Sequence, residues 1–196
     1  MSKRASVLLA LSLVSLAACG GSGTGATPGA GPSPVNVNRL PDWFTNVPSD
    51  ANTMYAAVTA ESRDLQLAIN KAVTDGRNNL AQQMEVKFEG MSKRFQEETG
   101  LGADAQLIDQ FTQAYKGIVS QTINGSRAAK QEIVNTPAGG YRAYVLVELP
   151  IGQASQALMQ RVRANEQMYT RFRASQAFDE LQKEVERYEA SQRPRP

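Results

Sequence analysis

The sequence contains one cysteine, Cys19, which stands directly after two small residues, Ala17 and Ala18. A cysteine thiolate is a soft nucleophile, so this sulfur atom is the clearest reactive group in the chain and a candidate for alkylation. Small residues before it suit a peptidase that binds its substrate in an extended form. Because there is no second cysteine, Cys19 cannot form a disulfide within the chain.

The start of the chain has the layout of an export signal. Lys3 and Arg4 form a short basic segment, and an apolar run follows over residues 7–18. This run is shorter than the roughly 20 apolar residues that span a hydrocarbon core, which argues against a retained transmembrane helix. A basic start, a short apolar region and small residues at the cleavage point are typical of a signal peptide, which we predict for residues 1–18.

Leu16-Ala17-Ala18-Cys19 resembles the lipobox of bacterial lipoprotein signal peptides. The resemblance implies cleavage between Ala18 and Cys19, attachment of a diacylglycerol to the sulfur and acylation of the freed amine. Several acyl chains would anchor the protein durably, since a single chain binds a membrane only marginally. Gly20 stands where an aspartate favours inner-membrane retention, so the resemblance implies the bacterial outer membrane. The alternative, an ordinary secretory signal, would leave an exposed reactive thiol.

Few groups for catalysis are found elsewhere in the sequence. There is no histidine, the commonest general base and metal ligand. Neither a glycine-rich phosphate loop nor a zinc-type ligand spacing occurs. Adjacent acids such as Glu97-Glu98 and Asp179-Glu180 point in different directions on a helix and are typical of solvated surface. We therefore expect no enzymatic activity, metal site or cofactor, although composition leaves serine–lysine and paired-carboxylate chemistry open.

Charge and composition change along the chain. Of the 21 basic residues, Lys3 and Arg4 are lost with residues 1–18, which leaves a mature chain formally neutral against its 19 acidic residues. This balance gives no support for nucleic-acid binding. Residues 19–39 are dominated by Gly, Ser, Thr and Pro, which predicts a lipidated flexible tether with a span of roughly 25 Å.

Residues 40–190 are expected to form a single α+β domain, followed by a disordered tail over residues 191–196. Trp43 and Phe44 precede the first regular element, and their apolar surfaces are expected to seal one end of the core. Helices are expected from residue 62, from 104 and from about 153 to 190, and strands over residues 53–60, 126–135 and 141–149. The order β-α-α-β-β-α predicts a small antiparallel three-stranded sheet packed by long helices.

Apolar spacing assigns the faces of these elements. Ser62 is expected to cap the first long helix, whose single apolar stripe comprises Leu65, Ala68, Ile69, Ala72, Gly76, Leu80, Met84, Phe88, Met91 and Phe95. Small residues in its first half would allow close contact with the sheet, and the bulkier second half would project beyond it. The next helix has an apolar face of its own: Leu107, Ile108, Phe111, Tyr115, Ile118 and Val119. In the strand over residues 141–149, alternate residues from Ala143 share one face, and Tyr144, Leu146 and Glu148 share a partly exposed one.

Two features of the last predicted helix suggest partners. Four arginines make its middle basic: Arg161, Arg163, Arg171 and Arg173. They suit a lipid phosphate, an anionic glycan or an acidic protein, and the alternative is a solvated face paired with local acids. Farther along, four residues recur at coiled-coil spacing: Phe178, Leu181, Val185 and Tyr188. This seam would either fold back on the domain or join copies into a homo-oligomer, and both alternatives stay open.

Several of these segments together resemble the "LPP-twenty" family of bacterial lipoproteins. The resemblance rests on the lipobox, Pro41-Asp42-Trp43, the strand over residues 55–60, the alanine-spaced helix with Ala68 and Ala72 followed by residues 77–80, and the strand over residues 141–150. The family is related to the N-terminal domain of the flagellar assembly T protein, and some members are built into flagellar outer-membrane structures. The resemblance implies an envelope lipoprotein and supplies no catalytic residues.

The expected function is therefore that of a non-catalytic lipoprotein, held on the membrane by acyl chains on Cys19. It would serve assembly or scaffolding with an envelope protein or with further copies of itself. The alternative is a binding module for cell-wall glycan or another envelope ligand.

Overall fold

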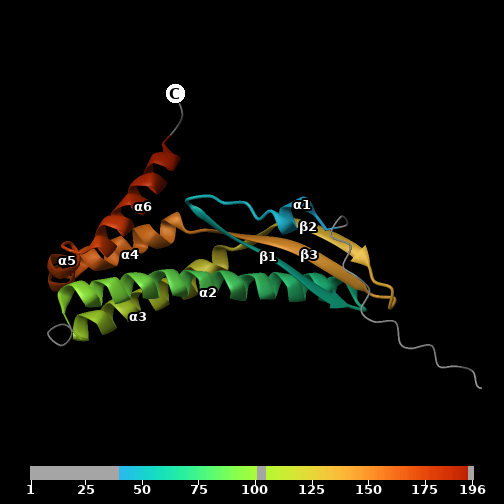
Figure 1. Ribbon diagram of the computed structural model, residues 1–196, viewed down its shortest axis with the longest axis horizontal. Coiled ribbons are helices and arrows are strands. Elements are labelled where there is room, and N and C mark those ends of the chain that lie inside the picture. The colour runs from blue at the N-terminus through green and yellow to red at the C-terminus, as the bar shows by residue number, and fades with distance from the viewer. Residues whose placement is uncertain (1–39, 101–104, 194–196) are drawn as a thin grey trace, which may run out of the picture. The chain divides into compact units, whose positions relative to one another are not determined.

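The computed structural model describes residues 40–100 and 105–193. The predicted signal peptide, Cys19 and the predicted tether lie outside these residues, as do residues 194–196 of the predicted tail. The elements are α1 (Asp42–Thr45), β1 (Thr53–Ser62), α2 (Leu65–Thr99), α3 (Ala105–Thr122), the 3₁₀ turn η2 (Ile123–Gly125), β2 (Arg127–Asn135), β3 (Tyr141–Pro150), α4 (Gly152–Ala164), α5 (Glu166–Phe172) and α6 (Gln176–Gln192) (Figure 1). The α+β class and the expected order of strands and long helices are confirmed.

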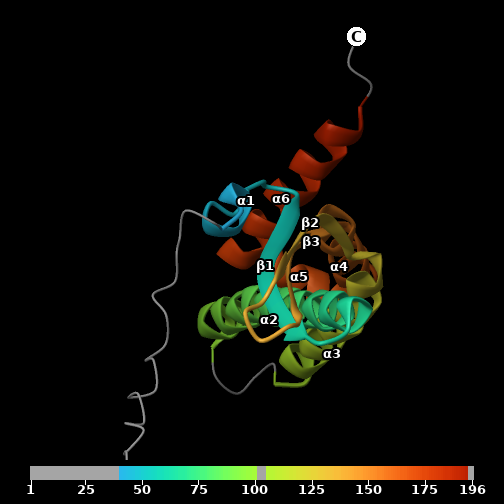
Figure 2. The same ribbon diagram turned by 90° about the vertical axis from the view of Figure 1, so that its right-hand side faces the viewer.

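The three strands form an antiparallel sheet, as predicted, and their order in the sheet is β1-β3-β2. β3 lies in the centre, paired with β1 from Thr53↔Pro150 to Ser62↔Tyr141. The β2–β3 pairing is interrupted by an irregularity between Ala128 and Lys130. α1 and α2 lie on opposite sides of this sheet (Figure 2). Both faces of β3 are consequently covered, and β1 and β2 form the two edges of the sheet.

The first half of α2 packs on one face of the sheet, and the predicted apolar stripe supplies the contact. Nine of its ten residues are buried or partly buried, and Leu65, which is 40% exposed, is the exception. Gly76 brings the helix close to β3, because an added Cβ would lie 2.4 Å from Cγ2 of Val147. The predicted N-cap, Ser62, is two residues too early. Asp64 is the N-cap, and its Oδ1 accepts a hydrogen bond from the Leu67 N–H at 2.7 Å.

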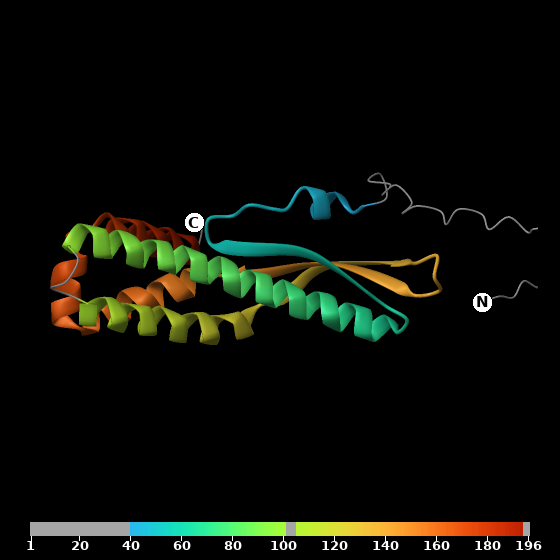
Figure 3. The same cartoon turned by 60° about the horizontal axis from the view of Figure 1, so that its bottom comes forward.

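The second half of α2 runs beyond the sheet and packs with α3 and the C-terminal helices (Figure 3). An aromatic cluster fills this part of the core. Phe172 of α5 lies at its centre, with ring centroids 5.0 Å from both Phe95 of α2 and Phe111 of α3, and 5.8 Å from Phe178 of α6. Four helices therefore meet at one buried side chain.

The opposite face of β3 is more buried than its sequence predicts. Tyr144 is 5% exposed and Leu146 is 1% exposed, whereas this face was expected to be partly exposed. The Phe44 ring of α1 packs edge-on against Tyr144 at 5.0 Å between centroids. The segment with Trp43 and Phe44 thus covers the outer side of the sheet, which explains the difference.

The prediction of one continuous last helix is wrong. Asn165 and Ser175 interrupt it and cap the helices that follow, so that the segment forms α4, α5 and α6. Asn165 Oδ1 accepts from the Met168 N–H at 2.9 Å, and Ser175 Oγ accepts from the Phe178 N–H at 3.2 Å. These two breaks turn the chain, so that α6 packs against α4 and α2 (Figure 3).

Candidate functional site

The four arginines of the predicted basic surface are exposed, but they belong to different helices. Arg161 and Arg163 lie in the last turn of α4, Arg171 lies in the last turn of α5, and Arg173 is the C-cap of α5. The C-terminal end of a helix carries a partial negative charge, so cations at these positions stabilise the helix ends. This placement gives the arginines a local structural role, and their predicted role in partner binding stays a prediction.

The predicted seam folds back on the domain. Leu181 is fully buried, and Phe178 and Val185 are at most 8% exposed. Tyr188 packs over Gly152 at the start of α4, where an added Cβ would lie 2.1 Å from the ring. The structure therefore uses these four residues within one chain, the first of the two alternatives. The predicted homo-oligomer stays a prediction.

A row of polar contacts joins α2 to the C-terminal helices beside this seam. Lys87 Nζ lies 2.7 Å from Glu184 Oε2, and the same oxygen accepts from the buried Ser155 Oγ at 2.8 Å. Arg94 pairs with Glu180 at 2.6 Å. The sequence patterns did not predict these contacts, although acids at 180 and 184 and cations at 87 and 94 follow helical spacing.

The same row ends at the start of α6. Glu98 Oε2 accepts a hydrogen bond from the Gln176 N–H at 2.9 Å. A carboxylate at this point satisfies a free N–H group and interacts favourably with the positive end of the helix. Together these contacts fix α6 along α2, and we regard them as structural.

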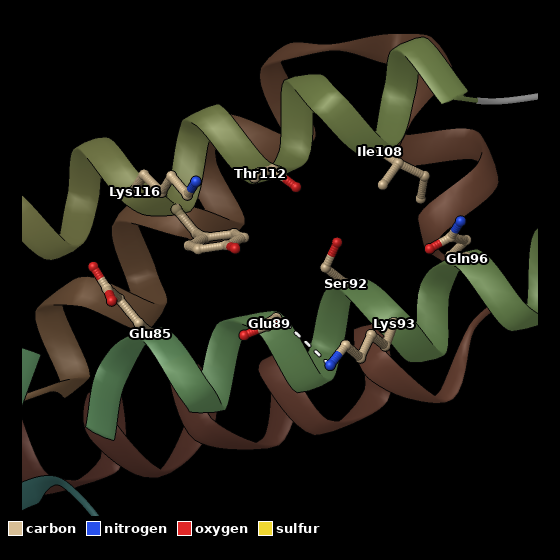
Figure 4. Close-up of a pocket in the computed structure, with 9 residues that line it drawn as sticks. Glu85, Glu89, Ser92, Lys93, Gln96, Ile108, Thr112 and Lys116 are labelled. Atoms are coloured by element: carbon tan, nitrogen blue, oxygen red, sulfur yellow. Dashed lines mark ion pairs between the residues drawn. The ribbon is translucent and has the colours of Figure 1, made fainter. Parts of the chain in front are cut away.

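A cleft of about 510 Å³ lies between α2 and α3. Its lining follows helical spacing on both helices: Glu85, Glu89, Ser92, Lys93 and Gln96 from α2, and Ile108, Thr112, Tyr115 and Lys116 from α3. Ser92 and Thr112 project into the space between the helices, and Glu89 pairs with Lys93 at 3.0 Å (Figure 4).

Burial and charge at this cleft act on Tyr115. Its side chain is 5% exposed, and burial raises the pKa of the phenol above its ordinary value of 10.0. The negative charges of Glu89 and Glu85 raise the pKa further, whereas the hydrogen bond with Thr112 opposes the change. The phenol therefore stays neutral and can donate a hydrogen bond throughout the physiological pH range.

The cleft offers hydroxyl groups at its base and both signs of charge at its rim. Such a set suits hydrogen bonding to a neutral polar ligand such as a glycan. Over residues 40–100 and 105–193, no group of three or more His, Cys, Asp or Glu side chains is placed to hold a metal ion. Within the same part of the chain, none of the helices combines the length and the apolar character needed to cross a bilayer.

The chain matches a known protein family. The family model described as LPP20 lipoprotein matches residues 41–150, which run from α1 to the end of β3. No curated protein and no solved structure gives a significant match. The matched residues include the segments on which the sequence resemblance rests, except the lipobox, and the resemblance to the family is confirmed. The match indicates a lipid-anchored protein of the cell envelope; α4, α5 and α6 lie beyond it.

Proposed function

The chain belongs to the LPP20 lipoprotein family, and from this premise we propose that it is a non-catalytic assembly or scaffolding protein of the bacterial outer membrane. The family match over residues 41–150 carries the proposal. The Leu16-Ala17-Ala18-Cys19 motif supplies the point of attachment, and the Gly/Ser/Pro-rich residues that follow supply reach. The folded unit presents helices and the edges of a sheet to neighbouring molecules, in structures such as those of the flagellar outer-membrane assemblies.

Attachment is tested by replacing the sulfur. Cys19→Ser should abolish labelling by a fatty-acid probe and leave the precursor uncut, because the diacylglycerol forms a thioether with this sulfur. Gly21→Ser is the matched control, since it changes a neighbouring residue, keeps the thiol and should be labelled and cut like the parent. Normal labelling of Cys19→Ser would contradict the assignment.

The assembly role is tested by cross-linking intact cells and purifying the protein from detergent-solubilised envelope. We expect an envelope protein or a second copy to be recovered with the parent chain. Recovery of the envelope protein should be lost with Cys19→Ser, which lacks the acyl anchor. Recovery of a strictly monomeric protein with no envelope partner would count against assembly. Separation of the membranes by density tests the outer-membrane location in the same cells.

The cleft between α2 and α3 favours a second candidate function, binding of a cell-wall glycan. Replacement of Lys93 and Lys116 by Ala removes two possible donors from its rim and should reduce recovery on purified cell wall. Replacement of Lys71 and Lys183 by Ala removes the same charge from exposed positions outside the cleft, and it should leave recovery on cell wall unchanged. Equal recovery of the two double variants would argue against a glycan site in the cleft.

A further inference from the structure

The two edges of the sheet differ in how far the rest of the chain covers them. At β1, the Gln83 side chain of α2 donates a hydrogen bond to the Tyr55 carbonyl at 3.3 Å. β2 is much more open: seven of its nine residues are exposed, and Ile133 is 40% exposed. An edge strand of this length presents backbone N–H and C=O groups on which another strand can pair. β2 is therefore the candidate surface for a second chain.

Two charged residues of opposite sign on β2 restrict which strand can pair with this edge. Lys130 pairs across the sheet with Leu146, and Glu132 pairs with Tyr144, so both charged residues lie on the outer face. Both are exposed. Gln131 lies between them and points to the face that carries α2. The sequence Lys130-Gln131-Glu132 is consequently a short strand with opposite charges on either side of a neutral residue.

We propose that two copies of the chain pair antiparallel through their β2 edges, about a twofold axis at Gln131. In this register Lys130 of each copy lies directly opposite Glu132 of the second copy, so the contact contains two opposite-charge pairs on one face. Directly opposed charges of opposite sign stabilise antiparallel strands, and like charges destabilise them. The two sheets together form one six-stranded sheet.

Neighbouring registers are disfavoured by the same charges. Side chains directly opposite one another must share a face, so a twofold pairing can move only from one central residue to the next. With the axis at Lys130, two lysines meet, and with the axis at Glu132, two glutamates meet. The register centred at Gln131 is therefore the one that matches unlike charges.

The strand also limits how far pairing extends. The irregularity between Ala128 and Lys130 and the lysine itself are features that prevent open-ended growth of a sheet edge. A twofold contact uses the same edge on both copies, so it closes on itself as a dimer and does not continue as a fibre. This inference goes beyond the proposed function, because it concerns a surface of residues 127–135 and does not depend on acylation.

Charge reversal tests the pairing in the full-length acylated chain, solubilised in detergent and weighed by light scattering. Lys130→Glu or Glu132→Lys alone places like charges at both symmetric positions and should weaken dimerisation by roughly tenfold or more. Mixing the two single variants should restore it, because each copy then meets its opposite charge. The double variant with both reversals should also dimerise. All of these changes lie on exposed positions, and circular dichroism verifies that each variant is folded.

Cysteine trapping tests the position of the axis. In Gln131→Cys, the two thiols face each other across the axis at a Cα separation of about 5 Å, which permits a disulfide. Asn135→Cys is the matched control on the same strand, where the two copies are roughly 27 Å apart. Oxidation should cross-link the first variant at least fivefold more than the second and more than the parent with Cys19 alone.

A parent chain that is monomeric over the micromolar range would overturn the pairing. So would a dimer that the single charge reversals leave unchanged, or equal cross-linking at positions 131 and 135. Any of these results leaves fatty-acid labelling at Cys19 intact, so this inference and the proposed function fail separately.

Discussion

Gly76→Ala provides a sharp test of the packing of α2 on the sheet. In the interior of a helix, Ala is favoured over Gly by about 1 kcal/mol, so helix propensity alone predicts a more stable protein. The structure predicts the opposite sign. The new Cβ would lie 2.4 Å from Cγ2 and 3.0 Å from Cβ of Val147, and 3.2 Å from Cγ2 of Val58.

Gly76→Ala is expected to be destabilising because the neighbouring valine side chains are stiff. Val147 is fully buried in the central strand, and a β-branched side chain has few rotamers in which to move its methyl groups. Helix and sheet must therefore separate, and overpacking of this kind costs about 1–3 kcal/mol. Taking the upper end and subtracting the gain in propensity, we expect Gly76→Ala to lower the free energy of unfolding by about 2 kcal/mol.

Gly90 in the same helix is the matched control, because an added Cβ there meets no atom within 4 Å. Gly90→Ala should raise the free energy of unfolding by about 1 kcal/mol, so the two identical substitutions should differ by about 3 kcal/mol. Urea titration followed by circular dichroism measures both, and the melting temperatures should differ by roughly 6–12 °C. If Gly76→Ala is as stable as Gly90→Ala, the close approach of α2 to β3 is refuted.

Two further predictions concern the helical half of the core. Phe172→Ala should lower the free energy of unfolding by about 4 kcal/mol, because it leaves a cavity where four helices meet. Phe172→Leu should lower it by less than about 2 kcal/mol. Similar urea midpoints for the two variants would contradict the central position of Phe172 in the aromatic cluster. For Tyr115, the raised pKa means that the unfolded chain releases the phenol proton at lower pH than the folded chain. The contribution of Tyr115 to stability is therefore complete below pH 10.0 and is lost as the pH rises through the folded-state pKa. Above pH 10.0, the stability of Tyr115→Phe should consequently depend less on pH than that of the parent. Equal pH dependence of the two melting temperatures would refute the shift in pKa.

The long helices and the central strand were predictable because their signals are local. The apolar stripe of α2 recurs every three or four residues for the whole length of the helix, and each position faces the same side whatever the distant chain does. In β3, alternation placed Val145 and Val147 on one face of the strand with Ala143, and both are fully buried. The burial of Tyr144 could not be predicted in this way, since it depends on Phe44, a residue from the other end of the domain.

The breaks in the last helix depend on a choice between two local structures. Asn165 and Ser175 are good N-cap residues, but both also occur inside helices when the apolar spacing continues through them, as it does here. The side chains cap because the chain must turn for α6 to reach α2. The Lys87–Glu184 contact could not be predicted from local sequence patterns, because it joins residues 97 positions apart. Either charge alone is typical of solvated surface.

The aromatic cluster around Phe172 has a consequence for biogenesis. An exported chain emerges from its amino end, so Phe95 and Phe111 reach the envelope well before the ring that completes their packing. In the same way, β1 cannot pair until β3 has emerged, because Thr53 lies opposite Pro150 in the sheet. Until those later segments arrive, apolar side chains of α2 stay in water, where they are prone to aggregate. A chaperone therefore has most to protect before the last helices are delivered, because only then is the apolar surface of α2 fully covered.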